Sequence, residues 1–198
     1  MKLIIASNNA HKVTEIREIL HDDFPDMVTL KEAGLDIDVV EDGTTFEQNA
    51  VKKAEAVLAA SGYPAALADD SGLIVDALDG APGVYSARYA GEGHDDAANN
   101  AKLMRDMRDV PDERRTCRFA SSIALARQGR PTLVVTGTCE GRLLHEAHGE
   151  NGFGYDPYFY YEPLGKAFAE LSAEEKNRVS HRRRSLEALK AALNNEKL

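Results

Sequence analysis

The first twenty residues contain the pattern that most constrains the fold of this chain. A short apolar run, Leu3 to Ala6, ends in Ser7-Asn8-Asn9, which is typical of a buried strand that leads into a loop. After the loop, apolar residues recur at the spacing of an amphipathic helix, which we expect to end at about His21: Val13, Ile16, Ile19 and Leu20. A strand, a loop and a helix in this order favour an α/β protein.

The remainder of the chain continues to mix strand-like and helix-like patterns. Strands are predicted at residues 36–40, 65–68, 73–78, 117–126 and 132–139, with a short addition at 143–144 and a hairpin across 128–130. Helices are predicted at residues 45–61, ending at Gly62, and 95–108, and in a region that opens with the capping box Ser172-Ala173-Glu174-Glu175 and breaks near Ser180. Between the second and third helices, residues 80–93 should form an ordered loop. The chain has 198 residues and no evident linker, so we expect a single domain over residues 1–198 with a mixed central sheet.

The charge distribution restricts the kinds of partner. The chain carries a formal net charge of −9, although the stretch from Gly165 onward holds eight Lys or Arg against five Asp or Glu. An acidic body argues against broad nucleic-acid binding, whereas a basic segment can bind a small anion or be a solvated helix face. The apolar run at the N-terminus is too short for a signal peptide, and no stretch approaches the ~20 apolar residues of a membrane span. With only two scattered cysteines, Cys117 and Cys139, we expect reduced thiols and a cytoplasmic protein.

The stretch Ala68-Asp69-Asp70-Ser71-Gly72 places two adjacent carboxylates directly after an apolar run. We expect a turn here, with strands on either side. Carboxylates at the end of a strand are suited to hold a hard divalent ion or to activate a water. The alternative is a plain turn, since Asp and Ser are common in turns for local reasons.

Two other segments are candidates for binding phosphate. The segment Ser7-Asn8-Asn9-Ala10-His11-Lys12 enters a helix, and free amides at a helix N-terminus favour an anion, which Lys12 can also reach. Glu41 precedes a glycine turn and can be a metal ligand, while Lys53 shares a helix face with Asn49 and can reach a phosphate. The alternatives are helix capping by Asn9 with an exposed Lys12, and solvated Glu and Lys side chains.

Near the C-terminus, two segments are suited to hold a nucleobase. Gly152-Phe153-Gly154-Tyr155-Asp156-Pro157 alternates glycine with aromatic residues, so its backbone can approach a ligand and a ring can stack on a base. Lys176, His181 and Arg182 lie in the basic segment, and His181 and Arg182 can donate hydrogen bonds to carbonyl oxygens. The alternatives are a rigid aromatic turn and a basic surface.

Together these segments resemble the Ham1-like inosine triphosphate pyrophosphatase family, whose members hydrolyse non-canonical purine nucleoside triphosphates. The resemblance covers nearly the whole chain and follows the family's order. It includes, besides the motifs above, Glu41-Asp42-Gly43-Thr44-Thr45-Phe46, the run Gly80 to Tyr89, and Glu175-Lys176-Asn177 leading to Ser180-His181-Arg182.

The resemblance implies an α/β fold with an elongated central sheet, flanking helices and two lobes around an active-site cleft, usually in a homodimer. It implies that Glu41 and Asp70 bind Mg²⁺ and that Asp70 is also the base toward water. Substrate contacts are implied for Ser7, Asn8, Asn9, Lys12 and Lys53 at the triphosphate, and for Phe153, Gly154, Tyr155, Asp156, Lys176, His181 and Arg182 at the base. Ala10, His11 and Ser71 are further implied substrate contacts. Two positions depart from the usual pattern, Gln48 and Arg183.

The reaction expected from this resemblance is attack of water on the α-phosphorus, which gives a nucleoside monophosphate and pyrophosphate. Selectivity would come from the 6-carbonyl of inosine or xanthosine, because donors such as Arg182 pair with it and remain unpaired opposite the 6-amino group of adenosine. A pyrophosphatase for modified pyrimidine triphosphates and a non-catalytic nucleotide-binding module are alternatives. A nicotinamide-dependent oxidoreductase is disfavoured, since Gly-x-Gly-x-x-Gly does not follow the first predicted strand.

Overall fold

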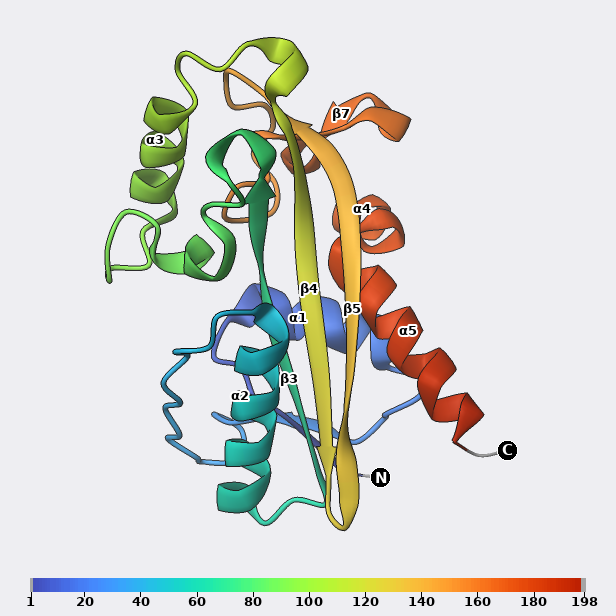
Figure 1. Cartoon of the computed structure of the whole chain (residues 1–198). Helices are drawn as coiled ribbons and strands as arrows, with labels where there is room; N and C mark the ends of the chain where they lie inside the picture. The colour runs from blue at the N-terminus through green and yellow to red at the C-terminus, as the bar shows by residue number, and fades with distance from the viewer. Residues whose placement is uncertain (1, 197–198) are drawn as a thin grey trace. The chain divides into compact units, whose positions relative to one another are not determined.

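The computed structural model describes residues 2–196 of the chain, which divide into two compact units. Unit 1 comprises Met1–Asp70, Ser121–Gly137 and Arg182–Leu198, and unit 2 comprises Ser71–Ala120 and Thr138–His181. Three long strands and the last helix supply residues to both units (Figure 1). We describe each unit by itself.

A seven-stranded mixed sheet has the strand order β2-β1-β3-β4-β5-β6-β7. Strands β1, β2 and β3 are parallel, and β5, β6 and β7 are antiparallel. The bounds are β1 Leu3–Ile5, β2 Met27–Thr29, β3 Ala65–Val75, β4 Thr116–Arg127, β5 Arg130–Leu143, β6 Phe159–Tyr161 and β7 Lys166–Ala167.

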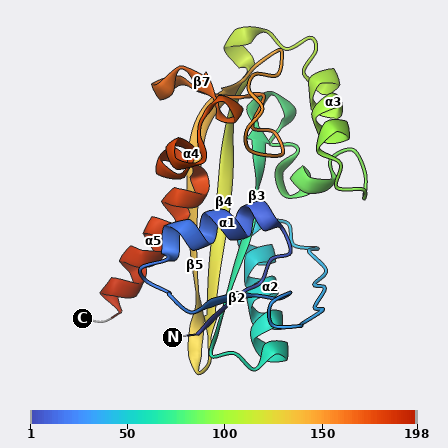
Figure 2. The ribbon, with the colours of Figure 1, turned by 180° about the vertical axis from the view of Figure 1, so that it is seen from behind.

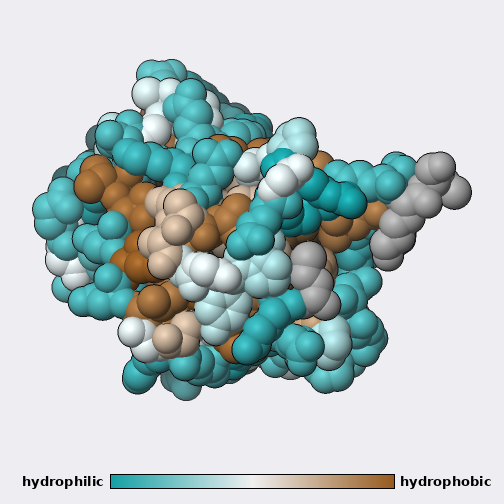
Figure 3. Space-filling view, turned by 90° about the horizontal axis from the view of Figure 1, so that it is seen from below, coloured by the Kyte–Doolittle hydropathy of each residue, from teal (hydrophilic) through white to brown (hydrophobic). Residues whose placement is uncertain are grey.

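The part of the chain that the structure describes contains five α-helices: α1 Ala10–Leu20, α2 Phe46–Ser61, α3 Asp96–Asp106, α4 Ala173–Val179 and α5 His181–Asn195. Short 3₁₀ helices lie at Asp76–Leu78, Gly83–Arg88, Asp112–Arg114, Glu162–Leu164 and Phe168–Glu170. Within residues 2–196, no helix is both long enough and apolar enough to cross a membrane. On the face shown in Figure 3, hydrophobic areas (brown) are interrupted by hydrophilic side chains (teal).

Unit 1 has helices on both faces of its part of the sheet, because successive side chains of a strand point to opposite sides. On one face, Ala65 and Leu67 of β3 pack with α1 and α5, and on the other, Ala66 and Ala68 pack with α2. Figures 1 and 2 show the two faces in turn. We call these faces the α1 side and the α2 side. Strand β3 is therefore covered on both faces in unit 1.

The core of unit 2 is aromatic. Phe159 contacts Phe119 and Phe168, with ring centroids 4.6 Å apart in both pairs, and Leu103 of α3 and Met107 at the C-cap of this helix belong to the same buried cluster. The C-terminal end of α3 is therefore packed into the core of its unit.

Most predicted elements are confirmed. Helices α1, α2 and α3 lie where the periodicity places them, and the two-residue turn Gln128-Gly129 joins β4 to β5. The capping box is present, since Ser172 Oγ accepts a hydrogen bond from the backbone N–H of Glu175 and the Glu175 carboxylate accepts one from that of Ser172. The helical region breaks at Ser180, between α4 and α5, as predicted.

The turn predicted at Asp69 to Gly72 is wrong. Strand β3 continues from Ala65 to Val75 without interruption, and residues 76–78, predicted as strand, form a 3₁₀ helix. Polar residues can remain inside a strand when partners from elsewhere satisfy them, and Asp69 has such partners in Lys12, Ser121 and Arg182.

The strand predicted at residues 36–40 is also wrong, because these residues lie in neither a helix nor a strand. Their alternation is real: Ile37 packs against the α2-side cluster while Asp36 and Asp38 are exposed. An alternation of apolar and polar residues indicates that one side of an extended segment is buried. A β-strand also needs a neighbouring strand with which to pair. Three short strands, β2, β6 and β7, were not predicted, since two or three residues are too few for a periodic signal.

Candidate active site

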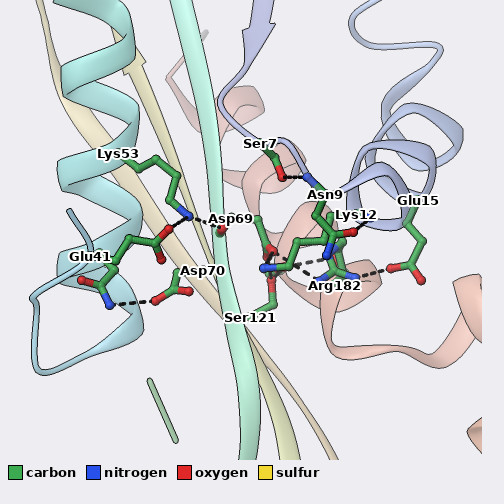
Figure 4. Close-up of polar contacts among 12 residues, drawn as sticks. Ser7, Asn9, Lys12, Glu15, Glu41, Lys53, Asp69, Asp70, Ser121 and Arg182 are labelled. Atoms are coloured by element: carbon green, nitrogen blue, oxygen red, sulfur yellow. Dashed lines mark hydrogen bonds and ion pairs between the residues drawn. The ribbon is translucent and has the colours of Figure 1, made fainter. Parts of the chain in front are cut away.

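The two carboxylates in the middle of β3 point to opposite faces of the sheet (Figure 4). Asp69 points to the α1 side, where it meets Lys12 and Arg182, and Asp70 points to the α2 side, where it meets Asn49. Both are buried, with 1% of Asp69 and 6% of Asp70 exposed. Asp69 and Asp70 therefore have different electrostatic surroundings although they are adjacent in the sequence.

Asp69 is held as a carboxylate by positive charge. Lys12 Nζ lies 2.9 Å and Arg182 Nη2 lies 3.2 Å from Asp69 Oδ2, and the Ser121 hydroxyl donates to Oδ1 at 2.5 Å. Burial acts to raise the pKa of Asp69, but the charges of Arg182 and Lys12 and the hydrogen bonds outweigh it and hold the pKa well below its ordinary value. Asp69 is thus a permanent anion that orients two cations.

The local sequence explains how Lys12 reaches this position. Asn9 is the N-cap of α1, its side chain accepts from the backbone N–H of Lys12 at 3.1 Å, and Ser7 Oγ accepts from the N–H of Asn9. The first turn of α1 contains no acidic residue, so the positive end of the helix dipole is not offset there. One turn after Lys12, Glu15 accepts from Arg182 and joins α1 to α5.

Asp70 has the opposite electrostatic situation. Its carboxylate accepts from Asn49 Nδ2 at 3.0 Å, and Asn49 Oδ1 in turn accepts from the backbone N–H of Gly43 at 2.8 Å. Burial and, to a smaller extent, the nearby charge of Glu41 raise the pKa of Asp70 to about 6, against the opposing charges of Lys12 and Lys53. Asp70 therefore changes charge near neutral pH in the metal-free protein.

Glu41 and Lys53 meet on the α2 side near Asp70. Lys53 Nζ lies 2.8 Å from Glu41 Oε1 and 3.3 Å from the backbone carbonyl oxygen of Asp69. Both Lys12 and Lys53 act electrostatically on Asp70. The structure thus brings together in unit 1 four side chains that the sequence predicted to act together: Lys12, Glu41, Lys53 and Asp70.

The donor set suits a hard divalent cation that keeps other ligands. Glu41 and Asp70 supply carboxylate oxygens, which Mg²⁺ prefers, and a cation beside Asp70 would relieve the repulsion between the two carboxylates. Among residues 2–196, no three His, Cys, Asp or Glu side chains gather in a way that would hold a metal. A cation here would therefore need oxygen ligands from water or from a bound phosphate.

The parallel strands explain why these residues meet. Strand β1 pairs in parallel with β3, and the backbone N–H of Ala6, just after β1, donates to Leu67 of β3. The segment that follows β1 therefore emerges next to Asp69 and Asp70. In α/β sheets, ligands bind beyond the carboxyl ends of parallel strands, which is where Ser7, Asn8, Asn9, Ala10 and His11 lie. Of these five residues, all but Ser7 are exposed.

In unit 2, Asp156 organises the predicted base-binding loop. Its Oδ2 accepts from Lys176 Nζ at 2.7 Å and from the backbone N–H of Phe153 at 2.9 Å. Lys176 Nζ also lies 4.6 Å from the centroid of the Phe153 ring. A Cβ on Gly152, whose φ is 75°, would lie 2.1 Å from Asp156 Oδ2, so only glycine allows the carboxylate this place.

Two other predicted residues of unit 2, Tyr155 and His181, are also buried. Tyr155 is 5% exposed and its hydroxyl donates to the backbone carbonyl of Ser86 at 2.6 Å, so most of its ring is core. The ring of His181, 4% exposed, stacks on Phe119 with centroids 4.8 Å apart. Ser71 is the first residue of unit 2 and is half-buried in β3, directly after Asp70.

Of the residues that hold the site of unit 1 together, Glu15 and Ser121 were not considered in the sequence analysis, and Asp69 and Asn49 were noted in their motifs without an assigned role in the site. Each is a polar side chain in the contacts described above. Ser121 lies in an apolar run and Asn49 on the apolar face of α2, and a polar residue in such a place is the signal that could have identified both.

An α/β fold in which the buried Asp70 lies near Glu41 and two lysines, Lys12 and Lys53, defines a protein suited to bind a phosphorylated ligand with a divalent cation. The chain belongs to the Ham1 family, whose sequence profile matches residues 3–192. The family resemblance and the mixed α/β fold predicted from the sequence are thereby confirmed.

Relatives and solved structures agree over nearly the full length. A dITP/XTP pyrophosphatase of Leuconostoc mesenteroides is 52% identical over 192 residues, which is 96% of this chain and 94% of that protein. The structure of the Staphylococcus aureus Ham1 protein gives a TM-score of 0.87 at 42% identity, covering 99% of this chain and 100% of that one. A Ham1 protein from Coxiella burnetii gives a TM-score of 0.88 at 38% identity, covering 98% of this chain and 99% of that one.

Proposed function

We propose that this protein hydrolyses non-canonical purine nucleoside triphosphates, such as the triphosphates of inosine, deoxyinosine and xanthosine, to the nucleoside monophosphate and pyrophosphate. The observation that carries the proposal is the buried Asp70 carboxylate with Glu41, Lys12 and Lys53 close enough to shift its pKa. The names of the curated relatives, which are dITP/XTP pyrophosphatases, support the substrate class.

The phosphate end of the substrate is assigned to unit 1. The N-terminus of α1, with Ser7, Asn8 and Asn9 before it and Ala10 and His11 in its first turn, favours an anion there. Lys12 and Lys53 add two mobile positive charges, which oppose the negative charge that a triphosphate carries. A phosphate would compete with Asp69 for Lys12 and with Glu41 for Lys53.

Mg²⁺ is the proposed metal, with Glu41 and Asp70 as its protein ligands. When bound, it would neutralise phosphate charge and make a nearby water more acidic. In the metal-free protein, Lys53 neutralises the charge of Glu41. When a cation binds to Glu41 instead, Lys53 can turn to the phosphates.

The proposed chemical step is an in-line displacement by water. Asp70 accepts a proton from water as the water oxygen bonds to the α-phosphorus, and the bond from that phosphorus to the bridging oxygen breaks to release pyrophosphate. Burial, which raises the pKa of Asp70 to about 6 in the metal-free protein, favours acceptance of a proton by this carboxylate. Asn49 orients the carboxylate through its hydrogen bond to Oδ2.

The base end is assigned to unit 2. In this assignment the Phe153 ring stacks on the purine next to Gly154, Asp156 accepts from a ring N–H and Lys176 donates to a carbonyl. The contacts of Asp156 with Lys176 and with the Phe153 N–H, which gather these residues, support it. Tyr155 and His181 complete the proposed base pocket, and Ser71 is a further proposed substrate contact.

Arg182 was predicted to donate to the 6-carbonyl of the base, and the structure gives its guanidinium other partners. Arg182 is 1% exposed and donates to Asp69 and Glu15. We therefore assign the recognition of the 6-carbonyl to Lys176, His181 and backbone amides. Arg182 acts as the counter-ion that keeps Asp69 ionised.

We further propose a homodimer in the cytoplasm. The dimer follows from the family resemblance. The compartment is supported by two buried free thiols, Cys117 and Cys139, which suit a reducing environment.

The test is pyrophosphate release from inosine triphosphate and from adenosine triphosphate, each with Mg²⁺ and with a chelator. We expect rapid Mg²⁺-dependent release from the inosine substrate only, and its loss in Asp70→Asn. Equal release from both nucleotides would contradict the selectivity but keep the reaction. Tight nucleotide binding without release would contradict hydrolysis altogether.

A further inference from the structure

Helix α3 holds both polar groups of one residue in the predicted base-binding loop. Asp96 Oδ2 accepts from the backbone N–H of Gly154 at 2.8 Å, and Asn100 Nδ2 donates to the carbonyl oxygen of Gly154 at 2.9 Å. Asp96 and Asn100 are four residues apart and therefore lie one above the other on the same helix face. Neither was among the residues predicted from the sequence.

The two hydrogen bonds from α3 fix the loop at Gly154, a residue that the Asp156 carboxylate does not contact in the hydrogen bonds described above. Within the loop, Asp156 holds the backbone N–H of Phe153, whereas α3 holds the next residue, Gly154, which has a left-handed φ of 61°. The position of the Phe153 ring depends on the backbone on both of its sides. Asp156 sets one side and α3 sets the other.

The environment of Asn100 indicates a purpose beyond packing. Its Oδ1 atom is buried and has no hydrogen-bond partner among the described residues, which is unfavourable for folding. Helix α3 is already anchored in the core of unit 2 by Leu103 and Met107, so Asn100 is not needed to attach the helix. An apolar residue would satisfy packing alone, and only an amide supplies the donor that Gly154 receives.

We propose that Asp96 and Asn100 are positioning residues for base recognition, acting through the Gly154 peptide on Phe153. The proposal rests on the function proposed above, in which this loop binds the purine. It places part of the base selectivity on a helix that is remote in sequence from the residues that contact the base.

Two variants test the contact. Asn100→Leu removes the donor together with the unpaired acceptor, and Asp96→Ala removes the acceptor for the Gly154 N–H. We expect each to raise KM for deoxyinosine triphosphate about three- to tenfold, as the loss of one hydrogen bond would do, with kcat nearly unchanged because unit 1 is untouched. Asp96→Asn keeps an acceptor oxygen and should restore KM to near the wild-type value.

The matched control is Asn99→Ala, which removes the same amide from the same helix. Asn99 is 2% exposed and binds Ala87 and Ala90, not Gly154. We expect Asn99→Ala to lower stability in urea more than Asn100→Leu does, and to leave KM unchanged. If Asn99→Ala raised KM equally, or if kcat and KM changed together in Asn100→Leu, the effect would be general loosening and the proposal would be wrong.

A binding measurement separates this inference from the proposed function. Calorimetric titration with inosine monophosphate needs no turnover, and we expect Asp96→Ala and Asn100→Leu to bind it three- to tenfold more weakly than wild type. If the wild-type protein hydrolyses deoxyinosine triphosphate and both variants have the KM and the monophosphate affinity of wild type, only the positioning role of Asp96 and Asn100 would be overturned. A wild-type protein that neither hydrolyses deoxyinosine triphosphate nor binds the monophosphate would overturn both.

Discussion

At the scale of single residues, Asp69 and Asp70 show how strongly surroundings determine ionisation. The two are neighbours on β3, yet the pKa of Asp69 lies well below its ordinary value and burial raises that of Asp70 to about 6. The difference arises because Asp69 faces Arg182 and Lys12 at hydrogen-bonding distance, whereas Asp70 faces an uncharged amide and lies near Glu41. One carboxylate is fixed in charge and the other can exchange a proton.

The raised pKa of Asp70 predicts that Asp70→Asn stabilises the metal-free protein at alkaline pH. A carboxylic acid with a folded-state pKa above its unfolded value contributes stability below about pH 4, and this contribution is lost as the pH rises through about 6. The variant avoids that loss, so the gain in the free energy of unfolding should be ~3 kcal/mol or less at pH 8 and small at pH 4. Urea unfolding with a chelator, at several pH values, measures it. A variant less stable than wild type at pH 8 would contradict the prediction.

Arg182 should behave in the opposite way. Arg182→Met removes one of the two cations that contact the buried Asp69, and breaking a buried ion pair from one side destabilises by about 3–5 kcal/mol. Glu15→Gln, on the far side of the same guanidinium, keeps a hydrogen-bond acceptor and should lower stability far less. Urea unfolding at pH 7 compares the two. Equal small losses would show that Asp69 does not depend on Arg182.

At the scale of elements, substitutions of Asn9, the N-cap of α1, should affect the stability of the protein and its substrate binding differently. Asn9→Ala removes the hydrogen bond to the Lys12 N–H and should lower stability by about 1 kcal/mol. Asn9→Asp retains a capping oxygen and adds a favourable charge at the helix N-terminus, so its stability should match or exceed that of wild type. That same charge would repel phosphate. We therefore expect Asn9→Asp to raise KM for the triphosphate, and steady-state kinetics beside urea unfolding would check both effects.

The elements also show what the sequence could and could not predict. Helices α1 and α2 were predicted because each has an apolar stripe and a local cap, Asn9 and Thr45. The continuity of β3 through Asp69 was not, because the partner that makes this carboxylate acceptable inside a strand is Arg182, 113 residues away. Within a short stretch of sequence, consecutive polar residues such as Asp69 and Asp70 indicate a turn. Only the folded structure shows that Asp69 is paired with Arg182.

The candidate site follows the same division. Asp70, Lys12 and Lys53 were predicted because their motifs match the family pattern, and the structure gathers them in unit 1. Asn49 and Asp96 were not assigned to the site, since an Asn or Asp on a helix has many ordinary uses, and only its contacts distinguish a positioning residue. The roles of Asn49 and Asp96 depend on contacts with residues that are distant in the sequence, which a local sequence pattern does not show.

At the scale of the whole molecule, the small number of metal donors predicts how the protein responds to Mg²⁺. Two carboxylates on an acidic chain with net charge −9 should attract the ion but bind it weakly without phosphate oxygens. We expect Mg²⁺ alone to shift the melting temperature little, and Mg²⁺ together with inosine monophosphate and pyrophosphate to shift it by several degrees. Thermal unfolding with each combination measures this. A large shift with Mg²⁺ alone would indicate further protein ligands.

The alternation of Asp69 and Asp70 on β3 also limits how the chain can change in length during evolution. Inserting or deleting one residue between Ala65 and Asp70 would move each following side chain to the other face of the sheet, so that the carboxylate meant for Asn49 would meet Arg182. Residues 36–43, which belong to no strand or helix, have no such register to lose. Length variation among relatives should therefore accumulate before α2 and be nearly absent from β3, even where substitutions in the strand are accepted.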